Sequence, residues 1–469
     1  MKYFAILSAA LVVFLLSGAE LEILSTTDLH GRLETMPQLG YALRSGGKEA
    51  LRIDCGDTVQ GSSISRHSGG EAMVAMLNLY GYDIWVPGNH DYEFGRDTLL
   101  GLVRSFCGTV LAADWVKSPA GTWKLFERNG VRCAVIGMTE PKMSQRVLPE
   151  DGFRFRGAYS TLAALMPEVR AVRPDVVVLA WHNGLYSSVG SLATFLRDFP
   201  EIDLVLGAHS HEEHPGQRVG HAWYVQPGAH AAAVARIRIE VNDDTRKILR
   251  IRSELLRPDP ERPDPEALRL LEPCRAAWRK DFFRPFVRLK EPLRRPKARE
   301  YNAVLGRIGG EALRRATGAE AAFFSVRTGN GSIGPEVTHE MLFQLIPYEN
   351  RVCMIELSGK EFRRFVEEQF ELARRWKRIP RFTGVTVSVS RAGKVTGVSA
   401  PERLTLALTD YALVSSRVLK PLLAEPGRKW KVFPFTEREA FGRELLRVGL
   451  PLPSGGNGLS RINSTDRMR

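Results

Sequence analysis

Apolar runs of strand length alternate with segments of helical spacing from Leu21 to about Glu254. Runs with the length and composition of buried strands cover residues 21–25, 51–54, 84–86, 131–137, 176–181 and 204–207. Helical apolar spacing marks residues 70–80, 159–172 and 189–197 between them. Two further β-rich runs, 219–225 and 233–241, predict the completion of a second sheet. This alternation predicts a layered α/β domain over residues 20–256.

The pattern changes after residue 256. Four prolines in the charged segment 257–265 exclude the interior of a helix or sheet there. Residues 266–280 have helical spacing and residues 282–297 are basic and broken by proline, so we expect residues 257–299 to form a linker with one helix. Helical segments at 303–316 and 359–376 and strand-like runs at 352–357, 384–389 and 404–408 follow. They predict a second, α+β domain over residues 300–469.

The first residues predict a targeting segment. Residues 4–16 are nearly all apolar, and they follow Lys2 and precede the small residues Ser17, Gly18 and Ala19. This order predicts a secretory signal peptide over residues 1–19. An uncleaved anchor is the alternative, but the run is short for a membrane span, and no later run is long enough. We therefore expect an exported protein, periplasmic or extracellular, with no stable membrane span after cleavage.

Composition and charge narrow the class of partner. The chain has 469 residues, of which 44% are hydrophobic and 25% charged, as is typical of a globular protein with a substantial core. Its net charge of +13 favours anionic partners. Nucleic acid, an anionic membrane and phosphorylated small molecules all fit that charge. No nucleic-acid-binding motif accompanies it, so we expect a small-molecule substrate and no nucleic acid polymer. Five scattered cysteines exclude a disulfide scaffold. We expect a monomer or a homodimer.

Polar motifs follow five of the predicted strands. In chain order they are Asp28-Leu29-His30, Gly56-Asp57, Gly88-Asn89-His90-Asp91, His182-Asn183-Gly184 and Gly207-Ala208-His209-Ser210-His211. Each motif alone could be a polar turn. Together they hold five of the ten histidines, at the strand ends where α/β sheets bind ligands. Carboxylate, imidazole and amide donors in one set suit Zn, Mn or Fe(II) better than Ca.

The same motifs resemble the signature of the calcineurin-like metallophosphoesterases. Thr27-Asp28-Leu29-His30-Gly31, and Gly56-Asp57 followed by Gly61-Ser62, make the chain similar to the exported 5′-nucleotidase/2′,3′-cyclic phosphodiesterase family. The resemblance covers nearly the whole chain after the predicted signal peptide and is stronger in the first domain. It implies a layered β-sandwich metallophosphoesterase domain flanked by helices, followed by an α+β substrate domain.

The resemblance also implies a centre of two divalent metal ions, Zn, Mn or Fe. One ion would take Asp28, His30, Asp57 and His211, and the other would take Asp57, Asn89, His182 and His209, with Asp57 as the bridge. Two ions held close together lower the pKa of a bridging water and clamp a phosphoryl group. The resulting hydroxide would attack phosphorus in line with the leaving oxygen.

A histidine that is not a ligand completes the implied machinery. His90 matches the family residue that stabilises transition-state charge or protonates the leaving group. The family places an aspartate three residues later, where this chain has Glu93. Asp91 lies nearer to His90 in the sequence. We expect His90, Glu93 and Asp91 to be catalytic, because a carboxylate can orient an imidazole and raise its pKa.

The second domain departs from the family pattern. The family motif Asn-Gly-Gly-x-Ile-Arg matches Asn330-Gly331-Ser332-Ile333-Gly334, so its arginine is missing. Tyr348 and Tyr411 match aromatic residues that stack on a base, although both could equally be core or interface aromatics. The family aspartate that holds the ribose is missing near Arg417. We expect Asn330, Tyr348 and Tyr411 to bind substrate, and Arg307 or Arg327 could supply the lost charge.

These observations predict a dinuclear metal-dependent phosphoester hydrolase of the 5′-nucleotidase or cyclic phosphodiesterase type. One alternative is a hydrolase of a non-nucleotide ester, such as a sugar phosphate or a sulfur ester. Another is a basic anion-binding protein whose metals are structural.

Overall fold

The computed structural model describes residues 18–187, 190–290, 298–327, 333–376 and 378–451. The predicted signal peptide falls almost wholly outside the described residues, so export stays a prediction. Gly18 and Ala19 are already part of the first strand, where they pair with Asn242 and Val241. Among the described helices, none combines the length and the apolar character that crossing a membrane requires.

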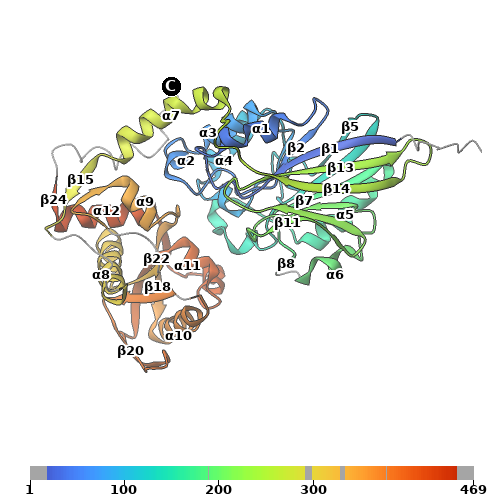
Figure 1. Cartoon of the computed structure of the whole chain (residues 1–469). Coiled ribbons are helices and arrows are strands. Elements are labelled where there is room, and N and C mark those ends of the chain that lie inside the picture. Colours follow the sequence, from blue (N-terminus) through green and yellow to red (C-terminus); the bar gives the residue numbers. More distant parts are fainter. Residues whose placement is uncertain (1–17, 188–189, 291–297, 328–332, 377, 452–469) are drawn as a thin grey trace, which may run out of the picture.

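The first domain is a sandwich of two mixed sheets (Figure 1). One sheet has the order β14 (Ile248–Leu256), β13 (Val234–Asn242), β1 (Gly18–Thr26), β2 (Leu51–Asp54), β3 (Ile84–Trp85) and β4 (Thr109–Val110). The other has the order β11 (Glu213–Val219), β12 (Ala222–Pro227), β10 (Leu204–Leu206), β7 (Val176–Trp181), β6 (Val131–Met138) and β5 (Trp123–Arg128). Strands β1 to β4 are mutually parallel, as are β6, β7, β10 and β12.

Alternating side chains build the layers of this domain. Ile23 of β1 lies in a buried cluster between the sheets with Val135 of β6 and Val178 of β7. Leu24, the next residue, points to the opposite face and packs under helices. The helices over that face are α1 (Met36–Arg44), α2 (Ser63–His67), α3 (Glu71–Leu79), α4 (Arg96–Ser105) and α7 (Pro265–Phe282). Helices α5 (Ala158–Ala171) and α6 (Leu192–Leu196) cover the other sheet.

Two details of the predicted strand pattern are wrong. The run 219–225 is not one strand, because Gly220 takes a φ of +65° and turns the chain between β11 and β12. Strand β13 does not complete the second sheet, because it pairs antiparallel with β1 in the first.

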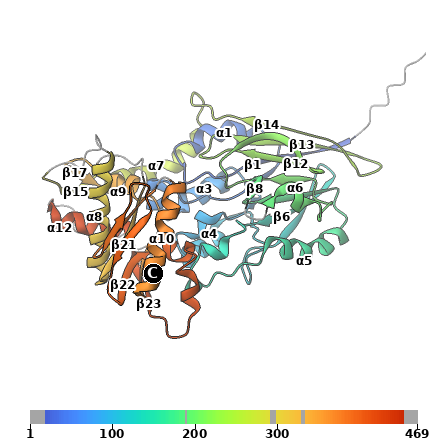
Figure 2. The same cartoon turned by 90° about the horizontal axis from the view of Figure 1, so that it is seen from below.

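The predicted linker is divided between the two domains. Helix α7 packs on the first domain through Ala267, Leu271 and Trp278. Strand β15 (Pro285–Arg288) instead pairs with β17 (Glu336–Thr338) and β24 (Leu450–Pro451) of the second domain. Helix α7 therefore reaches from one domain toward the other, as Figures 1 and 2 show.

The second domain is built on a five-stranded sheet. Its order is β19 (Arg378–Thr383), β16 (Ala321–Arg327), β22 (Arg403–Thr409), β18 (Arg351–Ser358) and β23 (Trp430–Thr436). Helices α8 (Ala298–Thr317), α9 (His339–Leu345) and α12 (Glu437–Val448) pack on one face, and α10 (Gly359–Trp376) and α11 (Asp410–Ser415) pack on the other. The remaining described elements are the hairpins β8 (Tyr186–Ser187)–β9 (Gly190–Ser191) and β20 (Thr386–Val389)–β21 (Val395–Ser399), and the 3₁₀ helices η1 (Asn89–Tyr92), η2 (Met143–Gln145), η3 (Pro149–Asp151) and η4 (Lys420–Ala424).

Candidate metal centre

The predicted metal ligands all follow strands whose carboxyl ends meet at one edge of the sandwich. Asp28 and His30 follow β1, Asp57 follows β2, Asn89 follows β3, His182 follows β7, and His209 and His211 follow β10. Parallel pairing brings the ends of β1, β2 and β3 together, and likewise those of β7 and β10. The fold therefore gathers residues that the sequence separates widely.

Five of these seven residues have left-handed backbone conformations. Asp28, His30, Asp57, His209 and His211 have φ values of 49°, 47°, 53°, 68° and 61°. Residues with a Cβ rarely adopt such values, and the strain persists only where the surroundings impose it. Here the loops hold one another, since the backbone N–H of Asp28 donates to Gly56 O and that of His30 donates to Asp57 O, both at 2.8 Å. Strain concentrated at these positions marks a functional site.

The ligand atoms form two groups, {Asp28, His30, His211} and {Asp57, His182, His209}, each with its donor atoms within 4.8 Å of one another. In the first group, Nε2 of His30 lies 3.0 Å from Nε2 of His211, which lies 3.4 Å from Oδ1 of Asp28. In the second, Nε2 of His182 lies 3.2 Å from Oδ2 of Asp57. That same carboxylate oxygen lies 3.9 Å from Nε2 of His30, so Asp57 reaches both groups.

Several of these donor atoms have no hydrogen-bond partner within the protein and are therefore available to bind metal ions. Among the described residues, Oδ1 of Asp28, Oδ1 of Asn89 and Nε2 of His182 are buried without a hydrogen-bond partner. A buried polar atom without a partner costs about 1–3 kcal/mol. Three such atoms, converging with facing imidazoles at strained loops, form a candidate donor set for two metal ions.

Hydrogen bonds made by Nδ1 of His30 and of His182 fix which ring nitrogen faces the metal centre. Nδ1 of His30 donates to the carbonyl of Gln60 at 3.1 Å, and Nδ1 of His182 donates to the carbonyl of Cys55 at 2.7 Å. Each bond orients the ring so that Nε2 is directed at the centre, as in the supporting shells of metal-binding histidines.

Glycines keep the space around these ligands open. A Cβ on Gly88 would lie 2.3 Å from both N and Oδ1 of Asp57, and 2.6 Å from Cε1 of His182. A Cβ on Gly56, whose φ is +96°, would lie 2.4 Å from N of Gly88. Both glycines are therefore required for the loops to approach each other closely.

The charges at the centre suit cation binding. Burial raises the pKa of Asp57, but the neighbouring charges of His182 and His90 outweigh burial and hold that pKa well below its usual range. Burial lowers the pKa of His30 and of His209 to about 4. At neutral pH the carboxylate is ionised and both imidazoles are neutral, which are the forms that bind metal.

His90 lies beside the centre and is held by Glu93. Its Nδ1 donates to Oε1 of Glu93 at 2.5 Å, and its Nε2 lies 4.0 Å from Oδ2 of Asp57. Burial lowers the pKa of His90, but the carboxylates of Glu93 and Asp57 outweigh burial and raise it to about 9. The ring is therefore protonated at neutral pH, with Nε2 directed toward the centre.

The side chain of Asp91 binds backbone groups of the neighbouring loops, and its expected catalytic role stays a prediction. Its Oδ1 accepts hydrogen bonds from the backbone N–H groups of Thr58 and Val59, and its Oδ2 accepts one from that of Gly88, all at 2.8 Å. The buried carboxylate thus ties the loops after β2 and β3 together. Asp91 supports the loops, and Glu93 alone of the two carboxylates contacts the His90 ring.

The predicted substrate contacts are placed only in part. The ring of Tyr348 stacks on that of His90, with centroids 5.9 Å apart and planes inclined by 22°. Tyr411 lies in the first turn of α11 and lines a cavity that Tyr348 also lines. Asn330 lies outside the described residues, as does the side chain of Arg327. Arg307 is exposed on α8 and does not line the cavity.

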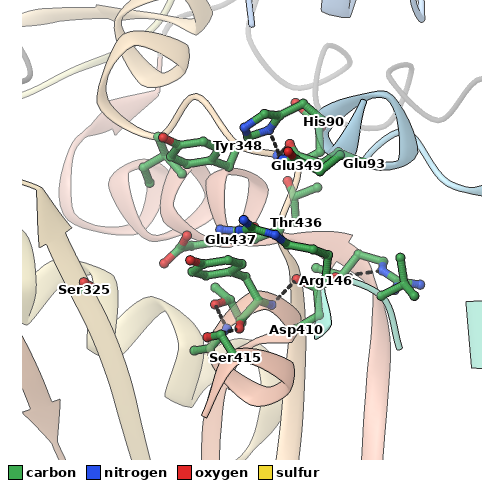
Figure 3. Close-up of a pocket in the computed structure, with 18 of the residues that line it drawn as sticks. His90, Glu93, Arg146, Ser325, Tyr348, Glu349, Asp410, Ser415, Thr436 and Glu437 are labelled. Atoms are coloured by element: carbon green, nitrogen blue, oxygen red, sulfur yellow. Dashed lines mark hydrogen bonds and ion pairs between the residues drawn. The ribbon is translucent and has the colours of Figure 1, made fainter. Parts of the chain in front are cut away.

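A cavity of about 1810 Å³ opens between the two domains, beside His90 (Figure 3). Its walls include Asn89 and His209 of the metal centre and Tyr348 and Tyr411 of the second domain. Four other polar residues also line the cavity, and the sequence motifs did not predict them: Arg146, Glu349, Asp410 and Glu437. These four residues are far apart in the sequence and share no spacing pattern, so sequence motifs could not have identified them.

His230 is a further residue at the centre that was not predicted. Its backbone N–H donates to Asp28 O at 2.7 Å, its ring centroid lies 5.0 Å from that of His30, and its φ is 59°. It follows the end of β12 after Pro227-Gly228-Ala229. The strand-end pattern that marked the other motifs could therefore have found it.

Comparison with known families agrees with this geometry. Residues 21–213 match the calcineurin-like phosphoesterase family, and residues 287–402 match the 5′-nucleotidase C-terminal domain. The chain joins these two domains. The family resemblance and the predicted fold class are thereby confirmed, since the calcineurin-like phosphoesterase domain is the helix-flanked sandwich and the 5′-nucleotidase C-terminal domain is the α+β unit.

Individual relatives of this two-domain chain are distant. A crystal structure of a Staphylococcus aureus protein in complex with α-ketoglutarate shares the fold, with a TM-score of 0.78 and 18% identity over 95% of this chain and 98% of that one. The 5′-nucleotidase of Vibrio vulnificus is 24% identical over 226 residues, 41% of this chain. Endonuclease YhcR of Bacillus subtilis is 20% identical over 404 residues, 74% of this chain. The matches span 40% and 33% of the lengths of those two relatives.

Proposed function

We propose that the protein is a metal-dependent phosphoester hydrolase that acts on nucleotides. The observation that carries this proposal is the set of three buried donor atoms without partners, on Asp28, Asn89 and His182, beside the imidazole of His90, whose Nε2 lies 4.0 Å from Oδ2 of Asp57. A structural metal site would have no use for that additional imidazole. The calcineurin-like phosphoesterase domain supports the same chemistry.

Two divalent ions would be held by the two ligand groups, with Asp57 between them and Asn89 adding its amide oxygen to the His182 group. When bound, such ions supply an activated water and neutralise charge on a phosphoryl group. The protein's own contribution is to fix the ligands. Strained loops, Gly88 and the hydrogen bonds to His30 and His182 set their positions before substrate arrives.

His90 supplies the proton at this site. Glu93 accepts from Nδ1 and so fixes the ring orientation and favours the imidazolium. The Nε2–H then faces the space next to Asp57, where it can stabilise charge on the phosphoryl oxygens and protonate a leaving oxygen. Tyr348 covers one face of the ring and limits access of water to it.

Nucleotides are the substrate class that the second domain favours, because it matches the 5′-nucleotidase C-terminal domain. Tyr348 and Tyr411 supply aromatic surface for a base in one cavity. A non-nucleotide ester is the second candidate. The region around Arg417 favours this candidate. The buried carboxylate of Glu368 accepts hydrogen bonds from Ser416 Oγ and Arg417 N, so it is not available to bind a ribose.

A substrate panel with metal analysis tests the proposal. Protein loaded with Mn or Zn is assayed on AMP, 2′,3′-cyclic AMP, UDP-glucose, bis-p-nitrophenyl phosphate and a single-stranded DNA oligonucleotide. We expect hydrolysis of AMP or the cyclic nucleotide, and His90→Ala should lower kcat by about 100-fold or more while the protein retains two ions. Two bound ions without hydrolysis of any of these esters would reject the proposed function. Turnover of the oligonucleotide alone would move the substrate class to nucleic acid.

A further inference from the structure

A guanidinium group from the first domain enters the interdomain cavity. Arg146 follows η2 and lines the cavity together with Asn89, His90 and Tyr411. Figure 3 shows it between the His90–Tyr348 pair and the Asp410–Ser415 helix. Its side chain is 29% exposed, so it is half-buried in the wall and open to the cavity.

One buried carboxylate anchors this arginine from behind. Nε of Arg146 donates to Oε2 of Glu140 at 3.4 Å, and the side chain of Glu140 is 5% exposed. Among the described residues, this is the only hydrogen bond of the guanidinium. The two terminal amino groups, Nη1 and Nη2, therefore keep their donors for a ligand, in the planar arrangement that matches two oxygens of a phosphate.

The charge of Arg146 acts on the metal centre. It lines the same cavity as Asn89, His90 and His209, and the Asp57 carboxylate stabilises the guanidinium. Tyr411 of the second domain also lies within its electrostatic reach. Arg146 is thus close to the place where the phosphoryl group of a substrate would meet the centre.

Three other arginines of the cavity wall are already paired. Arg351 binds Asp151 and Asp410, Arg66 binds Glu349, and Arg417 lies beside Glu368 and Glu371. Each of these charges is neutralised within the protein. Arg96 and Arg374 also line the cavity but are exposed, so Arg146 is the half-buried arginine of the wall whose terminal amino groups stay available for an anionic substrate.

We propose that Arg146 binds the unesterified oxygens of a terminal phosphoryl group and thereby selects phosphomonoesters over phosphodiesters. The inference rests on the proposed function and names the substrate class of that same site. A monoester presents a dianion with three unesterified oxygens, whereas a diester presents a monoanion with two. The monoester therefore offers the guanidinium one more oxygen and one more negative charge, which favours that substrate.

Arg146→Gln, Arg146→Lys and the control Arg154→Gln are compared on two substrates. Arg154 is exposed, lies eight positions farther along the chain and does not line the cavity. Charged hydrogen bonds contribute about 10- to 100-fold to binding, so kcat/KM for AMP should fall by about that factor in Arg146→Gln. The value for bis-p-nitrophenyl phosphate should change less than about 3-fold. Arg146→Lys should recover part of the AMP activity, because it keeps the charge but not the paired donors.

Binding of inorganic phosphate to the metal-loaded proteins gives a readout without turnover. Titration calorimetry should show about a 10-fold or larger increase in Kd for Arg146→Gln and an unchanged Kd for Arg154→Gln. Equal losses on both esters, or an unchanged phosphate Kd, would overturn the role of Arg146 while leaving the proposed function intact. A wild-type protein that hydrolyses no ester would reject the proposed function instead, and the phosphate titration would still decide on Arg146.

Discussion

Nδ1 of His90 lies 2.5 Å from Oε1 of Glu93. Glu93 stands at the position where the family resemblance implies an aspartate. The other carboxylate oxygen of Glu93 accepts from the backbone N–H of Glu349 in the second domain, at 3.3 Å. One side chain therefore links the proton-bearing ring of the first domain to the second domain. The additional methylene of glutamate relative to aspartate lets it reach both partners.

Replacing Glu93 should lower catalysis without removing metal. In Glu93→Gln the amide cannot stabilise the imidazolium, so we expect kcat on AMP to fall by about 10- to 100-fold with two ions still bound. Glu93→Asp should recover part of kcat, because it restores the charge. Steady-state kinetics and elemental analysis measure both effects. Loss of metal in Glu93→Gln would show that the residue supports the ligands and not His90.

Metal stoichiometry should depend on the ligand that is changed. Asp57→Asn removes the carboxylate that reaches both groups, so we expect fewer than two ions and loss of activity. His211→Ala removes a predicted ligand, 42% exposed, of one group only, and one ion should remain. Inductively coupled plasma mass spectrometry of dialysed protein counts the ions. If Asp57→Asn keeps two ions, the bridging position of Asp57 is refuted.

Gly88 should be intolerant of even one methyl group. In Gly88→Ala the new Cβ meets Asp57 and His182, so the loops must separate. We expect a loss of about 1–3 kcal/mol in unfolding free energy and weaker metal binding. Gly101→Ala is the matched control, because its Cβ in α4 meets only the tip of Arg104 at 4.0 Å. That control should stabilise the helix by about 0.5–1 kcal/mol, as urea unfolding would show.

That the predicted metal ligands lie together could be predicted, because they obey a rule that the sequence carries. Asp28, Asp57 and His182 each follow an apolar run, and the carboxyl ends of parallel strands share an edge. The roles of Asp91 and Glu93 could not be separated in this way. Residues 89–92 form a 3₁₀ helix, in which positions i and i+3 lie on the same side. Glu93 therefore reaches His90, while Asp91, one position later than His90, points back into the loops.

The cavity walls could not be predicted, because they depend on how the domains meet. Gln60 donates through Nε2 to the carbonyl of Pro347 at 2.9 Å, across a separation of 287 residues. Arg146 and Glu140 are isolated charges in a loop, and only the docked second domain makes their surroundings a cavity. Such residues lack the spacing or repetition that a sequence pattern requires.

A buried carboxyl in the cavity wall should make stability depend on pH. Burial raises the pKa of Glu437 to about 7, and the charge of Asp410 adds to this. Because the folded pKa exceeds the unfolded value, the contribution to stability is present below about pH 4.5 and is lost as pH rises through 7. Glu437→Gln cannot ionise, so at pH 8 it should be more stable than the wild type by about 1–3 kcal/mol.

The advantage of Glu437→Gln should disappear near pH 4.5. Urea unfolding at both pH values measures it, with exposed Glu402→Gln as the control, which should change stability by less than about 0.5 kcal/mol. An equal gain from Glu437→Gln at both pH values would show that the effect does not come from ionisation.

Glu349 should hold the second domain against the metal centre. Its side chain is 4% exposed and binds Arg66 of the first domain at 2.6 Å as well as Arg438 of the second. The adjacent Tyr348 covers His90, and the backbone N–H of Glu349 contacts Glu93. Removing one partner of a buried ion pair typically costs about 3–5 kcal/mol. In Glu349→Gln this cost should fall on the docked arrangement of the domains, because one paired arginine comes from each.

We therefore expect Glu349→Gln to lower kcat on AMP while both ions stay bound, and to expose the segment 346–350 to limited proteolysis. Glu425→Gln removes a half-exposed carboxylate that binds Arg428 within the second domain, and it should leave both properties unchanged. A double-mutant cycle with Arg66→Ala isolates the contact between the domains. Additive losses in that cycle would mean that Glu349 and Arg66 do not couple, and docking would then rest on other contacts between the domains, such as those of Gln60 and Arg351.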